Sequence, residues 1–359
     1  MGKKARVVVQ RRPTKRQLSR WQKEKQVQRF ILAGGAFVIL LVLSIPLVGF
    51  AREFVFKGRE PVARVEQNVL TLSEYASILG LRSYLLDSQI DNLQRALGQS
   101  GDQLQTTLQR MESLRASLPD QVVSDWTSEQ LIRQEASRQG LTVGPSEVTE
   151  AIRTEFDPVP EEGSEPKPLS EEEFQSRYRD FLTRARTTDA LYRKQREFTL
   201  LAQKLESRLQ EQVPSQGPQV HLQAILVGTE EIAKDAAARL EGGEDFAQVA
   251  QEVSLDTASK EKGGDIGWVP RGLLEKEAED AAFSLKVGQT SPPLDTAQGF
   301  YILKALEREE SREIEASLLD LLKSRVLDQW LEQAQEQARV ERYLTSDKVT
   351  WAEKQNRRR

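Results

Sequence analysis

The segment from Gln219 to Leu306 decides the fold of this chain through the order of its parts. Those parts are QVHLQAILV (219–227), GGEDFAQVAQEVSLD (242–256), KGGDIGWVPRG (262–272), DAAFSLKVGQTSPPLDT (280–296) and GFYILKAL (299–306). The apolar first and last parts are typical of strands, and the glycines at 263–267 favour a turn because glycine tolerates backbone angles that other residues avoid. The segment therefore predicts a small domain that combines helices with an antiparallel sheet.

This order resembles the parvulin family of peptidyl-prolyl cis-trans isomerases across residues 219–307. The resemblance implies isomerisation of X-Pro bonds, a reaction that needs no cofactor and no metal. The family normally carries one histidine on its first strand and one on its last, and these places fall on Ala224 and Tyr301. The resemblance therefore predicts the fold of this domain but not its isomerase activity, because a fold alone does not establish a function.

The resemblance also implies which residues form the catalytic part of the site. Ser254-Leu-Asp256 matches the family's S-x-D step, so Asp256 is expected where a Cys or Asp faces the substrate carbonyl. Tyr301 retains a hydrogen-bond donor at the second histidine position, and Thr296 matches a threonine before the last strand. A role for Asp256 as a solvated turn residue stays open, since aspartate is common in turns.

The substrate-binding residues implied by the resemblance are Leu274, Phe283 and Gln298. Leu274 falls where a pocket methionine is common, and Gln298 replaces a frequent aromatic residue. Ala278 falls where a pocket phenylalanine is expected, and this exchange lowers the binding of a proline ring by up to about 2 kcal/mol. We therefore expect weak prolyl binding and slow isomerisation.

His221 is the only histidine of the chain, but it is not a substitute for the missing pair. It lies three residues before Ala224, and side chains an odd number of residues apart on a strand point to opposite faces. We expect it at the surface or at a sheet edge. One histidine and no cysteine also exclude disulfides, thiolate metal sites and histidine-rich metal sites.

Residues 30–51 read FILAGGAFVILLVLSIPLVGFA and contain no charged side chain, which predicts a single transmembrane helix. A buried core helix and a cleaved signal peptide are the alternatives, but the first would show a polar face and the second a small-residue cleavage site. Residues 1–29 carry eleven Lys or Arg against one Glu, which predicts a cytoplasmic N-terminus. Residues 1–29 carry a net charge of +10, so the remaining residues carry −14 of the net −4 of the whole chain. This acidic remainder is predicted to be extracytoplasmic.

The sequence pattern of residues 60–212 predicts a helical domain. Thr71-Leu-Ser-Glu74 and Ser170-Glu-Glu-Glu173 are capping boxes, and the second opens a helical run through Gln212. The beginning of this region resembles the N-terminal domain of SurA-type periplasmic chaperones. An apolar stripe at heptad spacing predicts either a client-binding arm or a helix packed on its neighbours; its members are Ile90, Leu97, Leu104, Met111 and Leu118.

Residues 311–345 are expected to form a C-terminal helix, and the same resemblance implies that it packs back on the helical domain, so that the parvulin-like module is an insertion. Residues 346–359 predict a disordered tail. The overall prediction is α+β, with one N-terminal transmembrane helix, a SurA-like helical domain completed by a C-terminal helix, and an inserted parvulin-like domain.

The composite prediction is a membrane-anchored, extracytoplasmic foldase and chaperone that acts on unfolded, newly exported polypeptides with X-Pro bonds. The alternative is a non-catalytic holdase or a scaffold with a degenerate parvulin domain. No nucleic-acid partner is expected, because the orientation of the transmembrane helix already explains the basic residues 1–29 beside it.

Overall fold

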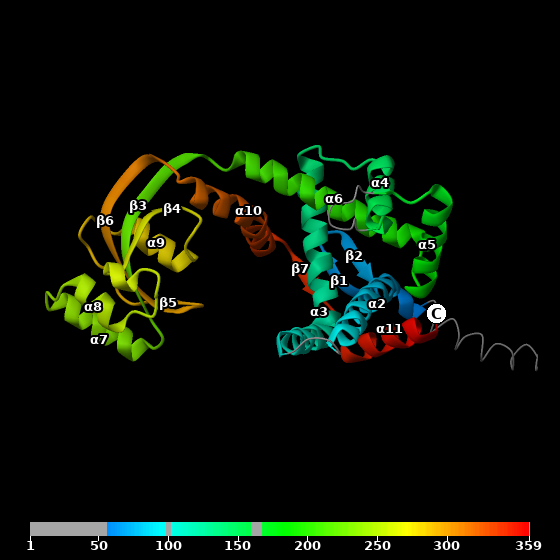
Figure 1. Ribbon diagram of the computed structural model, residues 1–359, viewed down its shortest axis with the longest axis horizontal. Helices are drawn as coiled ribbons and strands as arrows, with labels where there is room; N and C mark the ends of the chain where they lie inside the picture. The colour runs from blue at the N-terminus through cyan, green and yellow to red at the C-terminus, as the bar shows by residue number, and fades with distance from the viewer. Residues whose placement is uncertain (1–55, 98–101, 159–166, 359) are drawn as a thin grey trace, which may run out of the picture. The chain divides into compact units, whose positions relative to one another are not determined.

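The computed structural model describes residues 56–97, 102–158 and 167–358, and these form two compact units (Figure 1). The described part of the first unit runs up to Ser124 and includes Thr183–Thr187 and the residues from Glu341 onward. The second unit takes Asp125–Leu182 and Thr188–Val340. Each unit combines helices with a small antiparallel sheet, so the predicted α+β class is confirmed. The basic tail and the predicted transmembrane helix at 30–51 lie outside the described residues. Within the described ranges, no helix has the length and apolar character that a membrane crossing needs.

The first unit is built on a three-stranded sheet with the order β2-β1-β7. Its elements are η2 (Lys57–Arg59), β1 (Pro61–Val65), β2 (Asn68–Thr71), α2 (Leu72–Leu97), the start of α3 (Asp102–Arg138), β7 (Val340–Arg342) and α11 (Ser346–Arg358). At the start of α2 the Glu74 N–H donates to Thr71 Oγ1 at 3.3 Å, as the predicted helix start requires.

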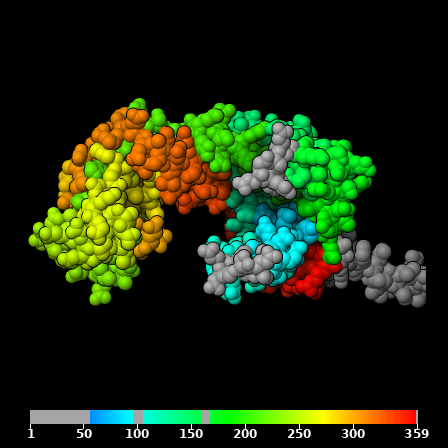
Figure 2. All heavy atoms as spheres, viewed as in Figure 1, coloured from blue at the N-terminus to red at the C-terminus, as the bar shows by residue number. Residues whose placement is uncertain are grey.

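Helix α11 corrects the expectation of a disordered tail at 346–359. It packs against α2, and Figure 2 shows its red surface against the blue and cyan surface of that helix. Trp351 and Ala352 of α11 are buried, and the Trp351 ring lies close to Gly58 of η2. Gly80 of α2 makes room for α11, because a Cβ there would lie 2.6 Å from Oδ1 of Asn356. Burial of Trp351 and Ala352 therefore orders a segment whose sequence is otherwise mostly polar.

Outside the inserted module, the helices of the second unit are the end of α3, α4 (Pro145–Phe156), most of α5 (Glu171–Arg184), α6 (Asp189–Gln212) and α10 (Ala316–Gln337). The capping box of Ser170 and Glu173 is confirmed, since each backbone N–H donates to the other's side chain, at 3.0 and 3.4 Å. The predicted continuous helix from 170 to 212 is wrong. Thr188 caps a new helix by accepting from the Leu191 N–H at 3.2 Å, and this separates α6 from α5.

Helix α10 packs against α6, as expected for a returning C-terminal helix. The predicted range of 311–345 is too long, because β6 extends to Glu313 and the helix begins at Ala316. The contact is apolar; Ile132, Leu205 and Leu209 form its buried centre, and Val326, Leu327, Trp330 and Leu331 of α10 pack on them.

The inserted module is a four-stranded antiparallel sheet with the order β4-β3-β6-β5. Its elements are β3 (Gln216–Val227), α7 (Glu230–Glu241), α8 (Phe246–Val253), η3 (Lys260–Lys262), β4 (Asp265–Pro270), α9 (Lys276–Ser284), β5 (Leu294–Thr296) and β6 (Gly299–Glu313). Helices α7 and α8 cover one face of the sheet and α9 covers the other. The glycine turn is sterically required, because a Cβ on Gly264 would lie 2.6 Å from the Ala224 carbonyl oxygen.

Candidate functional site

The candidate site lies on the face of the sheet that α9 covers. Register places Ala224 opposite Leu303 and Leu226 opposite Tyr301, so Ala224 and Tyr301 are diagonal neighbours across β3 and β6. Ala224 is fully buried in the core cluster of this face, and Tyr301 packs against the same cluster while half exposed. The structure therefore brings together the two positions at which the resemblance expects histidine.

Tyr301 is a neutral hydrogen-bond donor in this site. Its hydroxyl donates to Oε1 of Gln298 at 3.1 Å. Burial raises the pKa of the Tyr301 phenol, and the negative charges of Asp256 and Glu275 raise it further. The phenol thus keeps its proton at neutral pH, and the two carboxylates that influence it belong to the same site.

Asp256 reaches the site because the segment after α8 runs beside the end of β3. The Leu255 N–H donates to the carbonyl oxygen of Leu226 at 2.7 Å, and Leu226 is the cross-strand neighbour of Tyr301. The carboxylate of Asp256 also organises its own turn, because it accepts from the Ala258 N–H at 3.2 Å and from the Ser259 hydroxyl. The two interpretations of Asp256, as a turn residue and as a site residue, are therefore compatible.

The apolar part of the site is formed by α9 and by the loop that precedes it. Leu274 and Phe283 both pack against the core cluster, whereas Ala278 is buried within it. The guanidinium of Arg271 lies 4.0 Å from the centroid of the Phe283 ring and 3.6 Å from the Glu279 carboxylate. The sequence interpretation missed Arg271; its position one residue before Gly272 in the loop is the signal that could have identified it.

The turn between β5 and β6 forms the remaining side of the site. Thr296 Oγ1 donates to the Gly299 carbonyl at 2.7 Å and accepts from the Gln298 N–H at 3.3 Å, so this hydroxyl is used within the turn. The Ala297 N–H donates to Oε2 of Glu275 at 3.0 Å. Glu275, which the sequence interpretation also missed, therefore links this turn to the loop before α9. We call residues 271–275 the pocket loop.

His221 lies on the other face of the sheet, as the odd spacing from Ala224 predicted. Of the two expected positions, surface or sheet edge, the edge is excluded because β3 is paired on both sides, whereas the side chain is partly exposed. Its Nε2 lies 2.9 Å from Oδ1 of Asp265, and its ring stacks on Trp268 with 5.5 Å between centroids. Among the described residues no group of three or more acidic or histidine side chains could hold a metal ion.

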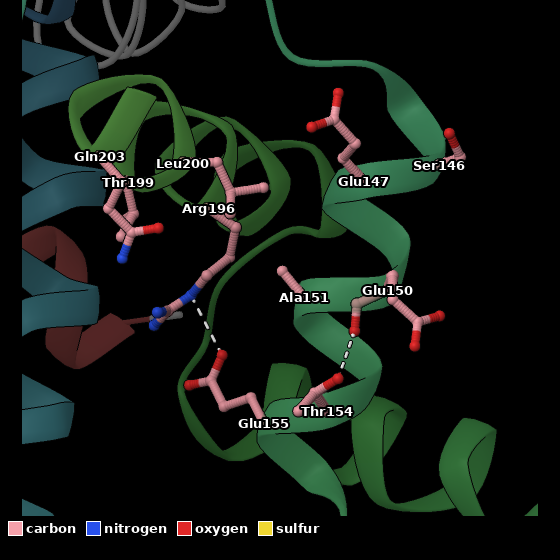
Figure 3. A pocket seen from close by; sticks show the side chains of 10 residues that line it. All are labelled: Ser146, Glu147, Glu150, Ala151, Thr154, Glu155, Arg196, Thr199, Leu200 and Gln203. Atoms are coloured by element: carbon pink, nitrogen blue, oxygen red, sulfur yellow. Dashed lines mark hydrogen bonds and ion pairs between the residues drawn. The ribbon is translucent and has the colours of Figure 1, made fainter. Parts of the chain in front are cut away.

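A separate hollow of about 970 Å³ lies between α4 and α6 in the helical part of the second unit (Figure 3). Its lining combines the apolar residues Ala151 and Leu200 with charged side chains such as Glu155 and Arg196. Most of this charge is already compensated, since Arg196 pairs with Glu155 at 3.2 Å and Lys204 pairs with Glu147 at 2.6 Å. The hollow contains none of the residues that the sequence interpretation selected.

Comparison with known families finds two matches. Residues 225–307 match the family described as a PPIC-type PPIASE domain, and residues 25–206 match the family described as a SurA-like N-terminal domain. The second match covers half of the chain. Among individual proteins, the foldase protein PrsA of Geobacillus sp. (strain WCH70) is 37% identical over 132 residues, which cover 37% of this chain and 48% of that relative.

Among solved structures, the peptidylprolyl isomerase PrsA of Bacillus anthracis is 19% identical, with a TM-score of 0.37 and coverage of 65% of this chain and 95% of that one. The parvulin domain of PpiD from E. coli is 30% identical over 26% of this chain and 92% of that one, with a TM-score of 0.25. These TM-scores are too low to establish a shared overall fold. The matches in sequence are the ones that identify the two domains.

Proposed function

The chain belongs to the family defined by the SurA-like N-terminal domain, and we propose that it is a membrane-anchored, extracytoplasmic foldase. Its SurA-like helical domain would bind unfolded, newly exported chains, and its PPIC-type domain would isomerise X-Pro bonds at a low rate. One observation carries this proposal: the domain match at 225–307 coincides with a site in which Tyr301, Asp256 and Phe283 surround one face of the sheet.

The chemistry of this site suits a slow isomerase. Rotation of an X-Pro bond has a barrier of roughly 18–20 kcal/mol, because the imide loses resonance when it twists. That resonance places negative charge on the carbonyl oxygen, so the negative charge of Asp256 beside this oxygen would oppose it and favour the twisted state. Phe283 and Leu274 would hold the proline ring, while Tyr301 would supply a neutral donor in place of histidine. Thr296 and Gln298 would keep the turn and Tyr301 in place.

The test is an isomerisation assay on a short X-Pro peptide with the full chain. We expect a rate above the uncatalysed one that falls several-fold in Asp256→Ala, because the charge beside the carbonyl is lost. Asp235→Ala, an exposed change on α7, is the matched control and should keep the rate. A rate equal to the uncatalysed one, at a protein concentration that saturates peptide binding, would sink the catalytic half of the proposal.

A non-catalytic holdase is the second candidate, and the loss of polar and aromatic groups at Ala224 and Ala278 favours it. Deletion of residues 219–306 separates the two functions, because a holdase should still suppress client aggregation without them. A scaffold with one dedicated partner is the third, and crosslinking from Met111 would then capture one stoichiometric partner in place of many clients.

Membrane attachment belongs to the same proposal and rests on the uncharged run at 30–51. Extraction with alkaline carbonate should leave the full chain in the membrane fraction and release a variant that lacks these residues. Protease added outside the membrane should digest the chain beyond residue 55 and leave the basic leader intact. Digestion of the leader instead would contradict the orientation.

A further inference from the structure

Helix α10 holds the pocket loop through three side chains on one of its faces. Gln329 Nε2 donates to the Gly272 carbonyl oxygen at 2.6 Å, and Arg325 Nη1 donates to the Leu273 carbonyl oxygen at 3.1 Å. Leu322 is the closest neighbour of Gly272, since a Cβ built there would lie 3.1 Å from its Cδ2. Spacings of three and four residues put these side chains on the same side of the helix.

The same loop is fixed from α9, so its backbone has little freedom left. The Gly272 N–H donates to the carboxylate of Glu279, and its carbonyl is taken by α10. Gly272 has a φ of 91°, a conformation that side-chain-bearing residues rarely adopt. Leu274 and Glu275 follow directly, and these residues form the apolar wall and the turn contact of the site.

A different face of α10 packs on α6. Leu327 and Trp330 belong to that apolar contact, whereas Gln329 and Arg325 point to the pocket loop. The helix is therefore in contact with the helical SurA-like part and with the loop that builds the site, both within the second unit.

We propose that Gln329 and Arg325 are positioning residues for the isomerase site: by holding the carbonyl groups of Gly272 and Leu273, they set the position of Leu274 and make prolyl binding depend on the docking of α10. This inference rests on the proposed function. Both side chains are bonded to backbone carbonyl groups of the pocket loop, so both act through that loop. A rearrangement of α6 and α10 on client binding would then alter the site.

The test uses the full chain with Gln329→Ala, Arg325→Ala and the double variant. Two readouts are followed: the Kd of a fluorescent X-Pro peptide and amide hydrogen exchange in residues 271–276. Loss of two hydrogen bonds should weaken peptide binding about three- to ten-fold in the double variant. Exchange in the pocket loop should quicken, while exchange in residues 219–227 of β3 should stay as in the unmodified chain. The rate constant for bound peptide should change less than the Kd.

Matched variants separate positioning from general destabilisation. Gln329→Lys keeps a donor and should retain binding, whereas Gln329→Glu keeps the shape without the donor and should behave like Gln329→Ala. Gln333→Ala, at an exposed position of the same helix, should leave both readouts unchanged. Arg325→Ala alone gives the same comparison if the double variant folds poorly.

The outcomes distinguish this inference from the proposed function. If the unmodified chain binds no X-Pro peptide, the proposed function fails and the positioning role fails with it. If the unmodified chain binds peptide but the double variant binds equally well, the positioning role alone is overturned. Faster loop exchange with an unchanged Kd overturns it too, because the loop would then not set the site.

Discussion

The two faces of the inserted sheet are made by the same strands, yet they differ in how tightly they are closed. On the α7 and α8 face, Ile225, Ile302 and Phe246 are almost completely buried. On the α9 face, Tyr301 and Phe283 are half exposed and surrounded by charged groups. Alternate residues of β3 serve alternate faces, so Ala224 on the site face and Ile225 on the closed face belong to separate clusters.

The largest expected difference between the two faces is the loss of stability when one aromatic ring on each face is truncated. Phe246→Ala should lower the free energy of unfolding by about 3–5 kcal/mol, because a buried ring leaves a cavity. Phe283→Ala should lower it by only about 1–2 kcal/mol, since this ring is half exposed and its outer side contacts Arg271. Amide exchange in residues 219–227 measures both. Equal losses would show that the site face is as important for stability as the closed face.

The second prediction restores histidine at each position. Ala224→His should lower the free energy of unfolding by about 1–3 kcal/mol, because it overfills a fully buried position and buries two ring nitrogens. Tyr301→His, at a half-exposed position, should change it by less than about 1 kcal/mol. Urea denaturation followed by exchange in β6 gives both values. A stable Ala224→His variant would show that the core of this face has room left for the histidine.

Local sequence signals predicted much of the fold. The two-residue period of a strand separated His221 from Ala224 correctly, and the capping-box pattern of Ser170 and Glu173 marked the start of α5. These features depend on neighbouring residues only. The sequence left open whether His221 lies at the surface or on an edge strand, because the order β4-β3-β6-β5 depends on pairing between distant segments. Helix α11 was missed because it packs against α2, which is far away in the chain.

The candidate site shows the same limit. The sequence selected Asp256, Tyr301 and Phe283, and the structure places them on one face of the sheet or beside its end. Arg271 and Glu275 were missed because their side chains reach the site through the path of the pocket loop, which α9, α10 and the β5–β6 turn hold together. No short-range pattern in the sequence records that path.

A third, smaller effect compares the helix starts on the two faces. Asp245 caps α8 by accepting from the Gln248 N–H at 3.2 Å, so Asp245→Ala should cost about 1 kcal/mol. Glu275 precedes α9 but makes no capping bond; its carboxylate accepts from Ala297 instead. Glu275→Ala should therefore leave α9 intact and quicken amide exchange at residues 296–299. Fraying of α9 in that variant would contradict this division of roles.

The smallest expected effect is an absence of pH dependence near neutrality. Burial and the neighbouring carboxylates raise the pKa of Tyr301 above its usual value of about 10, so its hydroxyl remains a donor from about pH 6 to pH 9. The folded state then binds this proton more tightly than the unfolded state, so the related stability is complete below pH 10 and is lost only as the pH rises further. The Kd of an X-Pro peptide should therefore not change with pH across the neutral range. In Tyr301→His the Kd should change with pH within this range, because an ordinary imidazole gains or loses its charge near neutral pH. In Tyr301→Phe the Kd should stay flat. A pH-dependent Kd in the unmodified chain would mean that another group, and not the Tyr301 hydroxyl, controls binding on this face.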